Sequence, residues 1–152
     1  MSGAVRELVT VSVQSATAAE ACLHLPFMVG GHRFAIPYSE VARVTLPDGI
    51  TTLGRYANLP SCVVGVTAAD SEMLTVVDVG LLYGSAAIHR NMKTRLIVMT
   101  DGPMKGFALL VTRVLDMAPL SGIRQGNDIR ITGAEELGTA MASLKKSNGE
   151  LK

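Results

Sequence analysis

The sequence has few charged and few aromatic residues. Charged side chains make up 18% of its 152 residues and aromatic side chains 4%, with no tryptophan. A formal net charge of +1 provides no basic face for a nucleic acid, and so few aromatic rings leave little on which bases could stack. We therefore expect no nucleic-acid partner.

Long hydrophobic runs are also missing. No stretch approaches the roughly 18 uninterrupted apolar residues of a membrane-spanning helix, so we expect no insertion into a membrane. Arg6 and Glu7 interrupt the apolar residues near the start, which predicts that no signal peptide is present. The expected location is the cytoplasm.

Residues that bind metals are scarce. Cys22 and Cys62 lie far apart and form no CxxC motif, which favours two small buried hydrophobic residues over a disulfide or a metal site. His24, His32 and His89 occur in three separate segments without ligand spacing, so we expect them at the surface or at strand edges. The sequence predicts neither a metal nor a cofactor.

Catalytic motifs are missing as well. There is no GxSxG motif, and the glycines at 102 and 106 precede a strand pattern, which predicts a hairpin turn and no phosphate loop. Asp78 interrupts an apolar run and leaves two interpretations open. It is either a buried catalytic acid with a raised pKa or, as is more common, a cap for the turn that follows its strand. We predict no catalytic residue.

Hydrophobic residues, in contrast, make up 48% of the chain. The length suits one compact unit that buries its own core. High hydrophobicity with low charge indicates either a dense core or an apolar surface that another protein covers.

Short β-branched runs separated by turn residues dominate the chain and predict a small all-β barrel or sandwich. We expect three hairpins, with turns at 30–31, 70–72 and 101–103. Pro37 ends the second strand of the first hairpin. Further expected elements are a helical turn at 39–44 with Val41 and Val44 on one side, an extended piece at 50–53 and a last strand at 129–132.

The C-terminal part predicts a helix. Thr132 and Glu135 fit a capping box, and Leu137, Met141 and Leu144 form one apolar stripe, so we expect a helix at 133–146. The expected organisation is a weakly ordered or flexible segment at 1–22, one domain at 23–146 and a tail at 147–152.

Five stretches in this order resemble the CheW-like family of chemosensory coupling proteins. They are residues 27–37, 41–44, 59–67, 74–79, and 94–99 continuing through 107–116. The likeness covers about residues 25–125. It implies two small five-stranded SH3-like β-barrels in one chain, with a hydrophobic core between them and a C-terminal helix.

The resemblance also implies a role. Members of this family are non-catalytic adaptors that join a methyl-accepting chemoreceptor to a CheA-type histidine kinase, in arrays beneath the inner membrane. The residues expected in the receptor-side groove are Val41, Arg43, Gly65, Asp70 and Ser71. Arg95 and Val111 extend this groove.

The chain departs from the family pattern at two charges and at its C-terminus. Family members have Asn-Leu-Arg-Gly where this chain has residues 68–71, so Asp70 replaces an arginine that faces the receptor. Arg43 stands where glutamate is common. We hypothesise that Arg43 and Asp70 form an ion pair with swapped charges. The C-terminal segment is shorter than usual, which could leave one barrel open at an edge.

Other functions stay open. One is an accessory adaptor, for example of a pilus-driven twitching motility pathway, that binds only the kinase or only the receptor. Another is a small β-barrel enzyme or ligand-binding protein that uses Asp78 or His32. An enzyme should show a deep pocket with convergent polar groups, whereas an adaptor should show shallow apolar grooves.

Overall fold

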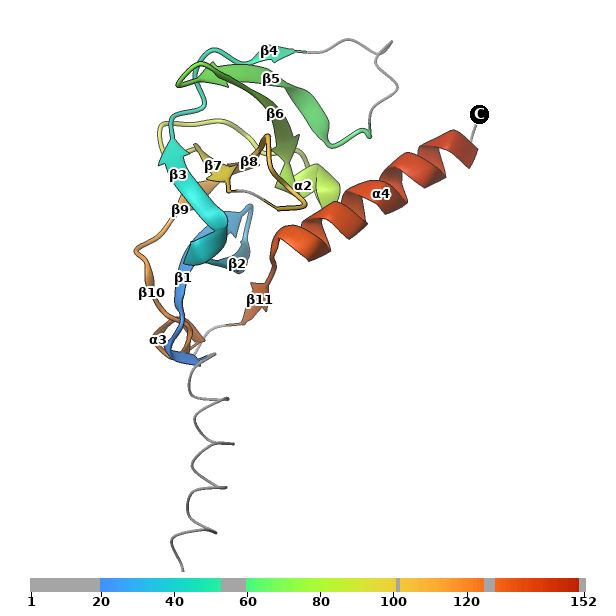
Figure 1. Ribbon diagram of the computed structural model, residues 1–152. Helices are drawn as coiled ribbons and strands as arrows, with labels where there is room; N and C mark the ends of the chain where they lie inside the picture. Colours follow the sequence, from blue (N-terminus) through green and yellow to red (C-terminus); the bar gives the residue numbers. More distant parts are fainter. Residues whose placement is uncertain (1–19, 53–59, 101, 125–127, 151–152) are drawn as a thin grey trace, which may run out of the picture.

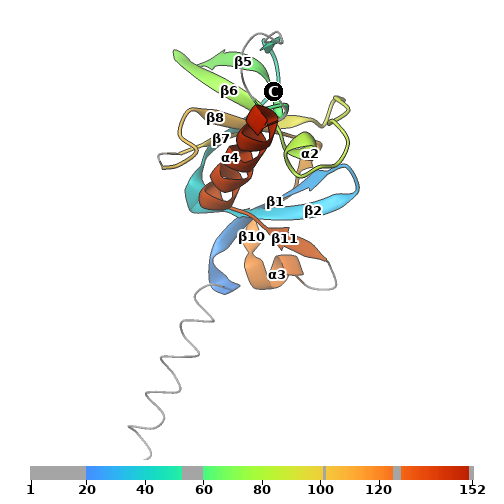
Figure 2. The ribbon, with the colours of Figure 1, turned by 90° about the vertical axis from the view of Figure 1, so that its right-hand side faces the viewer.

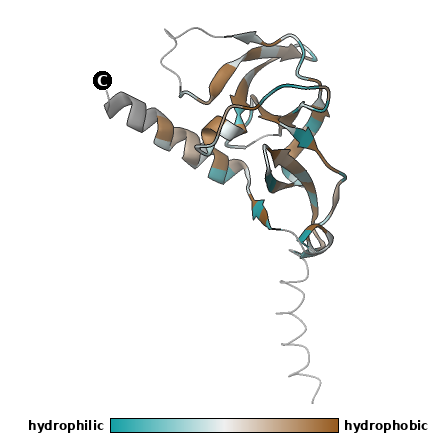
Figure 3. Ribbon diagram, turned by 180° about the vertical axis from the view of Figure 1, so that it is seen from behind, coloured by the Kyte–Doolittle hydropathy of each residue, from teal (hydrophilic) through white to brown (hydrophobic). Residues whose placement is uncertain are grey.

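The fold consists mostly of β-strands in two mixed sheets, with few helices (Figure 1). The computed structural model describes residues 20–52, 60–100, 102–124 and 128–150. Of the N-terminal segment expected at 1–22, residues 1–19 lie outside this description. Hydrophobic residues concentrate in the strands of both sheets (Figure 3).

The first sheet, called sheet A, has five strands. β1 (Leu23–Val29) and β2 (His32–Pro37) form the expected antiparallel hairpin around Gly30, whose φ is +59°. The strand order is β10-β1-β2-β11, and β9 also pairs with β1. The remaining strands are short: β9 (Arg113–Val114), β10 (Ala118–Pro119) and β11 (Ile129–Ile131), which runs parallel to β2.

The second sheet, called sheet B, has six strands in the order β3-β7-β8-β6-β5-β4. Both central hairpins predicted from the sequence are confirmed, because β5 pairs antiparallel with β6 and β7 with β8. The two hairpins join through a parallel pairing of β6 with β8. The strands are β3 (Val41–Thr45), β4 (Thr51–Thr52), β5 (Val63–Ala69), β6 (Glu72–Asp78), β7 (Arg95–Met99) and β8 (Phe107–Val111).

The strand pairings differ from a pair of five-stranded barrels. Sheet B has a sixth strand, and pairings among the described residues close neither sheet. Closure requires the two edge strands to pair with each other, but β4 has two residues and β11 has three, too few for a full ladder.

One core joins the two sheets and the C-terminal helix. Fully buried side chains meet there from sheet A, sheet B and the helix, among them Phe27, Ile36, Val77, Ile97, Leu109 and Leu137. A smaller cluster covers the opposite face of sheet B and includes Leu74, Val76, Leu96 and Leu110. Burial of each side chain of this kind contributes about 1.5–3 kcal/mol to the free energy of unfolding. The expected core between two β units is present.

The segment at 39–44 is not the helical turn that we expected. A 3-10 turn, η1 (Tyr38–Glu40), comes first, and the strand β3 follows directly. Val41 is buried at 8% exposure, whereas Val44 is 39% exposed, so the two side chains do not share a side. Pairing with β7 overrides the local pattern, because a β-branched residue packs well on a sheet.

The C-terminal helix α4 (Ala134–Glu150) is confirmed and extends beyond its predicted end. It lies across the two sheets (Figure 2) and then projects from the body (Figure 1). Leu137 and Met141 face the core at 0% and 9% exposure. Two short helices, α2 (Val79–Leu82) and α3 (Leu120–Arg124), complete the described elements.

The predicted capping box does not start α4. The Thr132 hydroxyl is hydrogen-bonded to the Tyr83 hydroxyl at 2.8 Å. The N–H of Ala134 instead donates to the carboxylate of Glu40 from η1. Gly133 permits this approach, because a Cβ there would lie only 3.1 Å from Glu40 Oε1. The first turn of α4 is therefore capped by Glu40, which is distant in the chain, and not by the predicted local pair of Thr132 and Glu135.

Candidate protein-binding surface

Arg43 and Asp70 form the expected ion pair, with Arg43 Nε 3.3 Å from Asp70 Oδ2. Arg43 lies on β3, and Asp70 lies in the turn between β5 and β6. The Arg43 side chain also donates a hydrogen bond of 3.5 Å to the carbonyl oxygen of Ala69. Since β3 and β5 do not pair, these contacts join two distant parts of sheet B.

The turn that carries Asp70 has an unusual backbone. Asp70 and Ser71 have φ values of +50° and +67°, as the two central residues of a type I′ hairpin turn do. Aspartate tolerates this region better than most residues, whereas serine gains no comparable relief. The turn fixes the position of the Asp70 carboxylate relative to Arg43.

Among the other predicted site residues, Arg95 is partly exposed, whereas Val41 and Val111 are buried. Arg95 lies at the start of β7, where its guanidinium donates to the carbonyl oxygens of Met92 and Thr94, at 2.8 Å each. Its ladder partner Val111 is fully buried, and Val41 is buried in the core. Both valines belong to the core that joins the two sheets.

Gly65 is also buried, for a steric reason. A Cβ on Gly65 would lie 2.3 Å from the backbone oxygen of Thr51, so only glycine lets β4 pair with β5 here. The structure therefore brings Arg43, Asp70 and Ser71 together at the surface and leaves Gly65 in a structural position.

Exposed apolar side chains lie close in the chain to both partners of the ion pair and were missed from the sequence. Val44, Leu46 and Met73 are 39%, 52% and 67% exposed. Val44 follows Arg43 on β3, and Met73 pairs with Ala68 beside the turn. We call these three side chains with Arg43 and Asp70 the rim surface. The alternation of Val44 and Leu46 would have indicated it, had β3 been predicted as a strand.

Asp78 acts as a cap, which was one of its two interpretations. It is 2% exposed and lies at the start of α2. Its Oδ1 accepts the N–H of Leu81 at 3.1 Å, and its Oδ2 accepts the N–H of Ile88 at 2.8 Å. Both oxygens thus hold the backbone that follows β6.

The cysteines behave differently from each other. Cys62 is fully buried, as expected, and burial raises the pKa of its thiol to about 11. Cys22 is exposed, so its expected burial was wrong. Cys22 lies just before β1, outside the core that β1 enters two residues later.

The three histidines differ in their exposure. His32 and His89 are exposed as expected, whereas His24 is 4% exposed, with its Nδ1 2.9 Å from the carbonyl oxygen of Cys22. Within the described residues no three His, Cys, Asp or Glu side chains gather as metal ligands. No helix in the same residues is long and apolar enough to cross a membrane.

Comparisons with known proteins identify the family and the fold. A family model described as CheW-like domain matches residues 24–137. The structure resembles the scaffolding protein TtCheW from Thermoanaerobacter tengcongensis, with a TM-score of 0.58 and 16% sequence identity. The match covers 66% of each chain, so this chain spans just under two thirds of that protein. None of the curated proteins matches it.

Proposed function

Because the chain belongs to the CheW-like domain family, we propose that it is a non-catalytic adaptor in chemosensory signalling. In this proposal it links a methyl-accepting chemoreceptor to a CheA-type histidine kinase. It works in the cytoplasm, at receptor arrays on the inner face of the membrane. The observation that carries the proposal is the family match over most of the described chain.

The rim surface supports this function. Its three apolar side chains are exposed to solvent. Apolar side chains of this kind become buried at the centre of a protein–protein interface. Arg43 and Asp70 add a charge pattern to this apolar surface. Exposed charges of this kind contribute more to the choice of partner than to affinity.

The swapped charges favour a particular receptor. A receptor segment built for the usual family charges would place like charges against Arg43 and Asp70. Like charges brought together at an interface are unfavourable, so we expect this adaptor to prefer a receptor with the complementary pattern. The same observation supports the second candidate, an accessory adaptor that no longer binds ordinary receptors and binds only the kinase.

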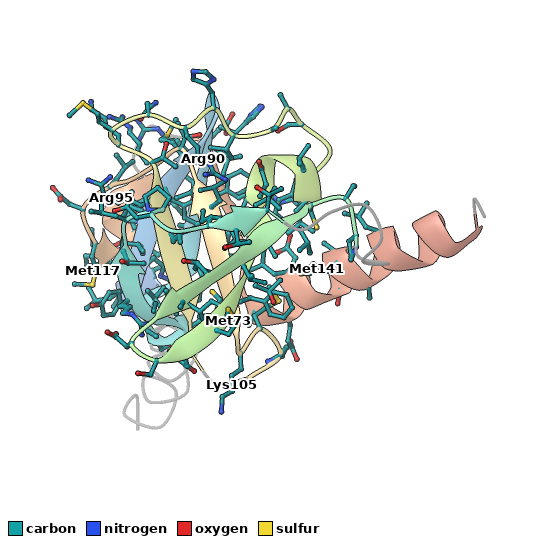
Figure 4. All side chains as sticks on the ribbon, turned by 90° about the horizontal axis from the view of Figure 1, so that it is seen from above. Met73, Arg90, Arg95, Lys105, Met117 and Met141 are labelled. Atoms are coloured by element: carbon teal, nitrogen blue, oxygen red, sulfur yellow. The ribbon has the colours of Figure 1, made fainter. Side chains whose placement is uncertain are left out.

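The test is a binding panel with the receptors and kinases of the same cell. We expect the purified chain to retain one kinase and at least one receptor fragment. Met73→Asp should weaken receptor binding by about tenfold or more, because it places a charge at a desolvated contact. Met117→Asp is the matched control, since Met117 is exposed in the connection between β9 and β10, well apart from Met73 (Figure 4).

Each outcome of the panel has a clear meaning. Binding to kinase alone would establish the accessory adaptor. Equal binding to all ordinary receptor tips would contradict the role of the swapped charges. Binding to neither class would overturn the proposal.

A further inference from the structure

Two adjoining hollows lie beside the hairpin of β1 and β2. The turn of this hairpin lies on the side of the molecule opposite β3 (Figure 2). The two hollows have volumes of about 770 Å³ and about 400 Å³. Both are lined by Val29, Gly31, His32 and Ser85, so they form one continuous depression. We call it the hairpin groove. One wall comes from β2 and β11, and the other from residues 83–91.

Arginine side chains outnumber acids in the lining of the groove. The lining includes Arg33 and Arg130 against the acid Asp128. The segment from 83 to 95 contains no acidic residue and adds Arg90 and Lys93, both exposed. Figure 4 shows Arg90 on the same side of the molecule as Arg95.

The two arginines of the groove differ in whether their guanidinium groups have partners within the protein. Arg130 lies 4.2 Å from the centre of the Tyr83 ring and pairs with Glu136 at 2.9 Å, so its guanidinium is held in place. Arg33 is exposed and has no acidic partner among the described residues. Arg33 is thus the cation in the groove that is available for a ligand.

An aromatic cluster forms the floor of the groove. Tyr83 stacks on Phe34 at 5.5 Å between ring centroids, and the Arg130 guanidinium lies 4.2 Å from the Tyr83 centroid and 5.9 Å from the Phe34 centroid. Phe34 in turn stacks on Phe27 at 5.5 Å. Phe34 and Arg130 both contact the Tyr83 ring and so reduce the area on which a base could stack.

The backbone beside the groove suits an extended chain. β11 is the edge strand of sheet A, so the outer side of its backbone has no strand partner among the described residues. An extended peptide adds to such an edge through main-chain hydrogen bonds, and neighbouring pockets select its side chains.

We propose that the hairpin groove binds an extended acidic peptide segment of a partner protein. The peptide backbone lies along β11, and its carboxylates meet Arg33, Arg90 and Lys93. The groove is remote from the rim surface, so this interaction does not depend on the function proposed above. It gives the adaptor a further contact that is selected by charge.

The experiment uses the whole protein and a fluorescein-labelled peptide of about eight alternating Glu and Val residues. Binding is followed by fluorescence anisotropy at about 50 mM and about 300 mM NaCl, because exposed charge contacts weaken with salt. We expect binding to the acidic peptide and at least about tenfold weaker binding to a peptide with Lys in place of Glu.

Variants assign the binding to the groove. Arg33→Glu should weaken binding about tenfold, and Arg33→Gln less, since only the first adds a repulsive charge. Arg43→Glu is the matched control, because it makes the same charge change on the opposite side and should alter affinity less than about twofold. Backbone NMR shifts on peptide addition should centre on residues 32–33 and 129–130.

Several results would overturn the proposal. They are no binding of the acidic peptide, equal binding of the lysine peptide, or an equal loss with Arg43→Glu. NMR shifts centred away from the groove would do the same. Displacement of the peptide by millimolar inorganic phosphate would assign the groove to a small anion, and displacement by single-stranded oligothymidine would assign it to nucleic acid.

Discussion

Arg43 and Asp70 bridge β3 and the β5–β6 hairpin, which do not pair with each other. Their 3.3 Å contact ties the edge strand β3 to the turn between β5 and β6. The Thr67 hydroxyl adds a second tie, a hydrogen bond of 3.1 Å to the carbonyl oxygen of Asp48 in the segment after β3. Side chains therefore draw the open sheet into a curled shape where the backbone ladder ends.

The ion pair should contribute little to stability. The Asp70 side chain is 80% exposed, so water screens its attraction to Arg43. A double-mutant cycle of Arg43→Ala and Asp70→Ala should give a coupling free energy of about 0–1 kcal/mol that decreases with salt. Urea unfolding of the four proteins measures it, and a coupling well above this range would show that the pair is a structural element.

The turn should be more stable with glycine. Ser71 adopts a φ of +67°, which glycine tolerates without steric penalty. Ser71→Gly should therefore raise the free energy of unfolding by up to about 1 kcal/mol. Ser61→Gly is the matched control, because Ser61 is exposed in a turn and is not among the residues with positive φ. Equal effects in both variants would contradict the strain at Ser71.

Glu40 should matter more to α4 than the predicted capping box. Glu40→Ala removes the acceptor for the Ala134 N–H and should lower the free energy of unfolding by about 1 kcal/mol. Glu40→Gln retains an oxygen acceptor and should lose less. Glu135→Ala serves as control, since it removes only a charge near the helix start, which is worth a few tenths of a kcal/mol. Amide hydrogen exchange in the first turn of α4 should rank the three variants in the same order. A larger effect of Glu135→Ala than of Glu40→Ala would support the capping box instead.

Asp78 should be required for folding stability. Asp78→Asn replaces one accepting oxygen with an NH₂ group, leaving a backbone N–H of Leu81 or Ile88 without its acceptor, at a cost of about 1–3 kcal/mol. Asp116→Ala, an exposed acid outside any element, should have little effect. Thermal unfolding compares the two. A stable Asp78→Asn protein would mean that other groups satisfy these backbone donors.

The buried thiol should make stability decrease in alkaline solution. Burial raises the pKa of Cys62 from 9.0 to about 11. Below pH 9 the thiol is protonated in both states and adds no pH dependence. Between pH 9 and 11 the unfolded chain loses this proton while the folded chain keeps it, so stability falls by up to about 1.4 kcal/mol per pH unit. Cys62→Ala should lack this part of the decrease. A parallel decrease in both proteins would assign it to other groups.

Hairpins were predictable because their signals are local. Alternating residues such as Leu25, Phe27 and Val29, followed by two glycines, specify both strands and the turn between them. The apolar stripe of Leu137 and Met141 predicted α4 in the same way, because helical spacing places both on the buried face. The ion pair of Arg43 and Asp70 came instead from the family resemblance, through the joint reversal of two charges.

What the sequence did not reveal depends on partners that are distant in the chain. β3 is a strand because β7 pairs with it, and α4 starts on Glu40 from a segment far upstream. The exposure of Cys22 and the burial of His24 depend on where sheet A ends. The hairpin groove escaped notice because the residues of β2, of β11 and of the segment after α2 meet only in three dimensions. No local pattern contains these relationships.

Sheet A also constrains the order in which the polypeptide folds during synthesis. Its strands come from residues 23–37 and 113–131, and the whole of sheet B is encoded between them. An isolated two-stranded hairpin is only marginally stable in water, so β1 and β2 must wait for partners that leave the ribosome last. We expect sheet B to fold first as the nucleus, while the early hairpin keeps its hydrophobic face exposed to chaperones until translation is nearly complete.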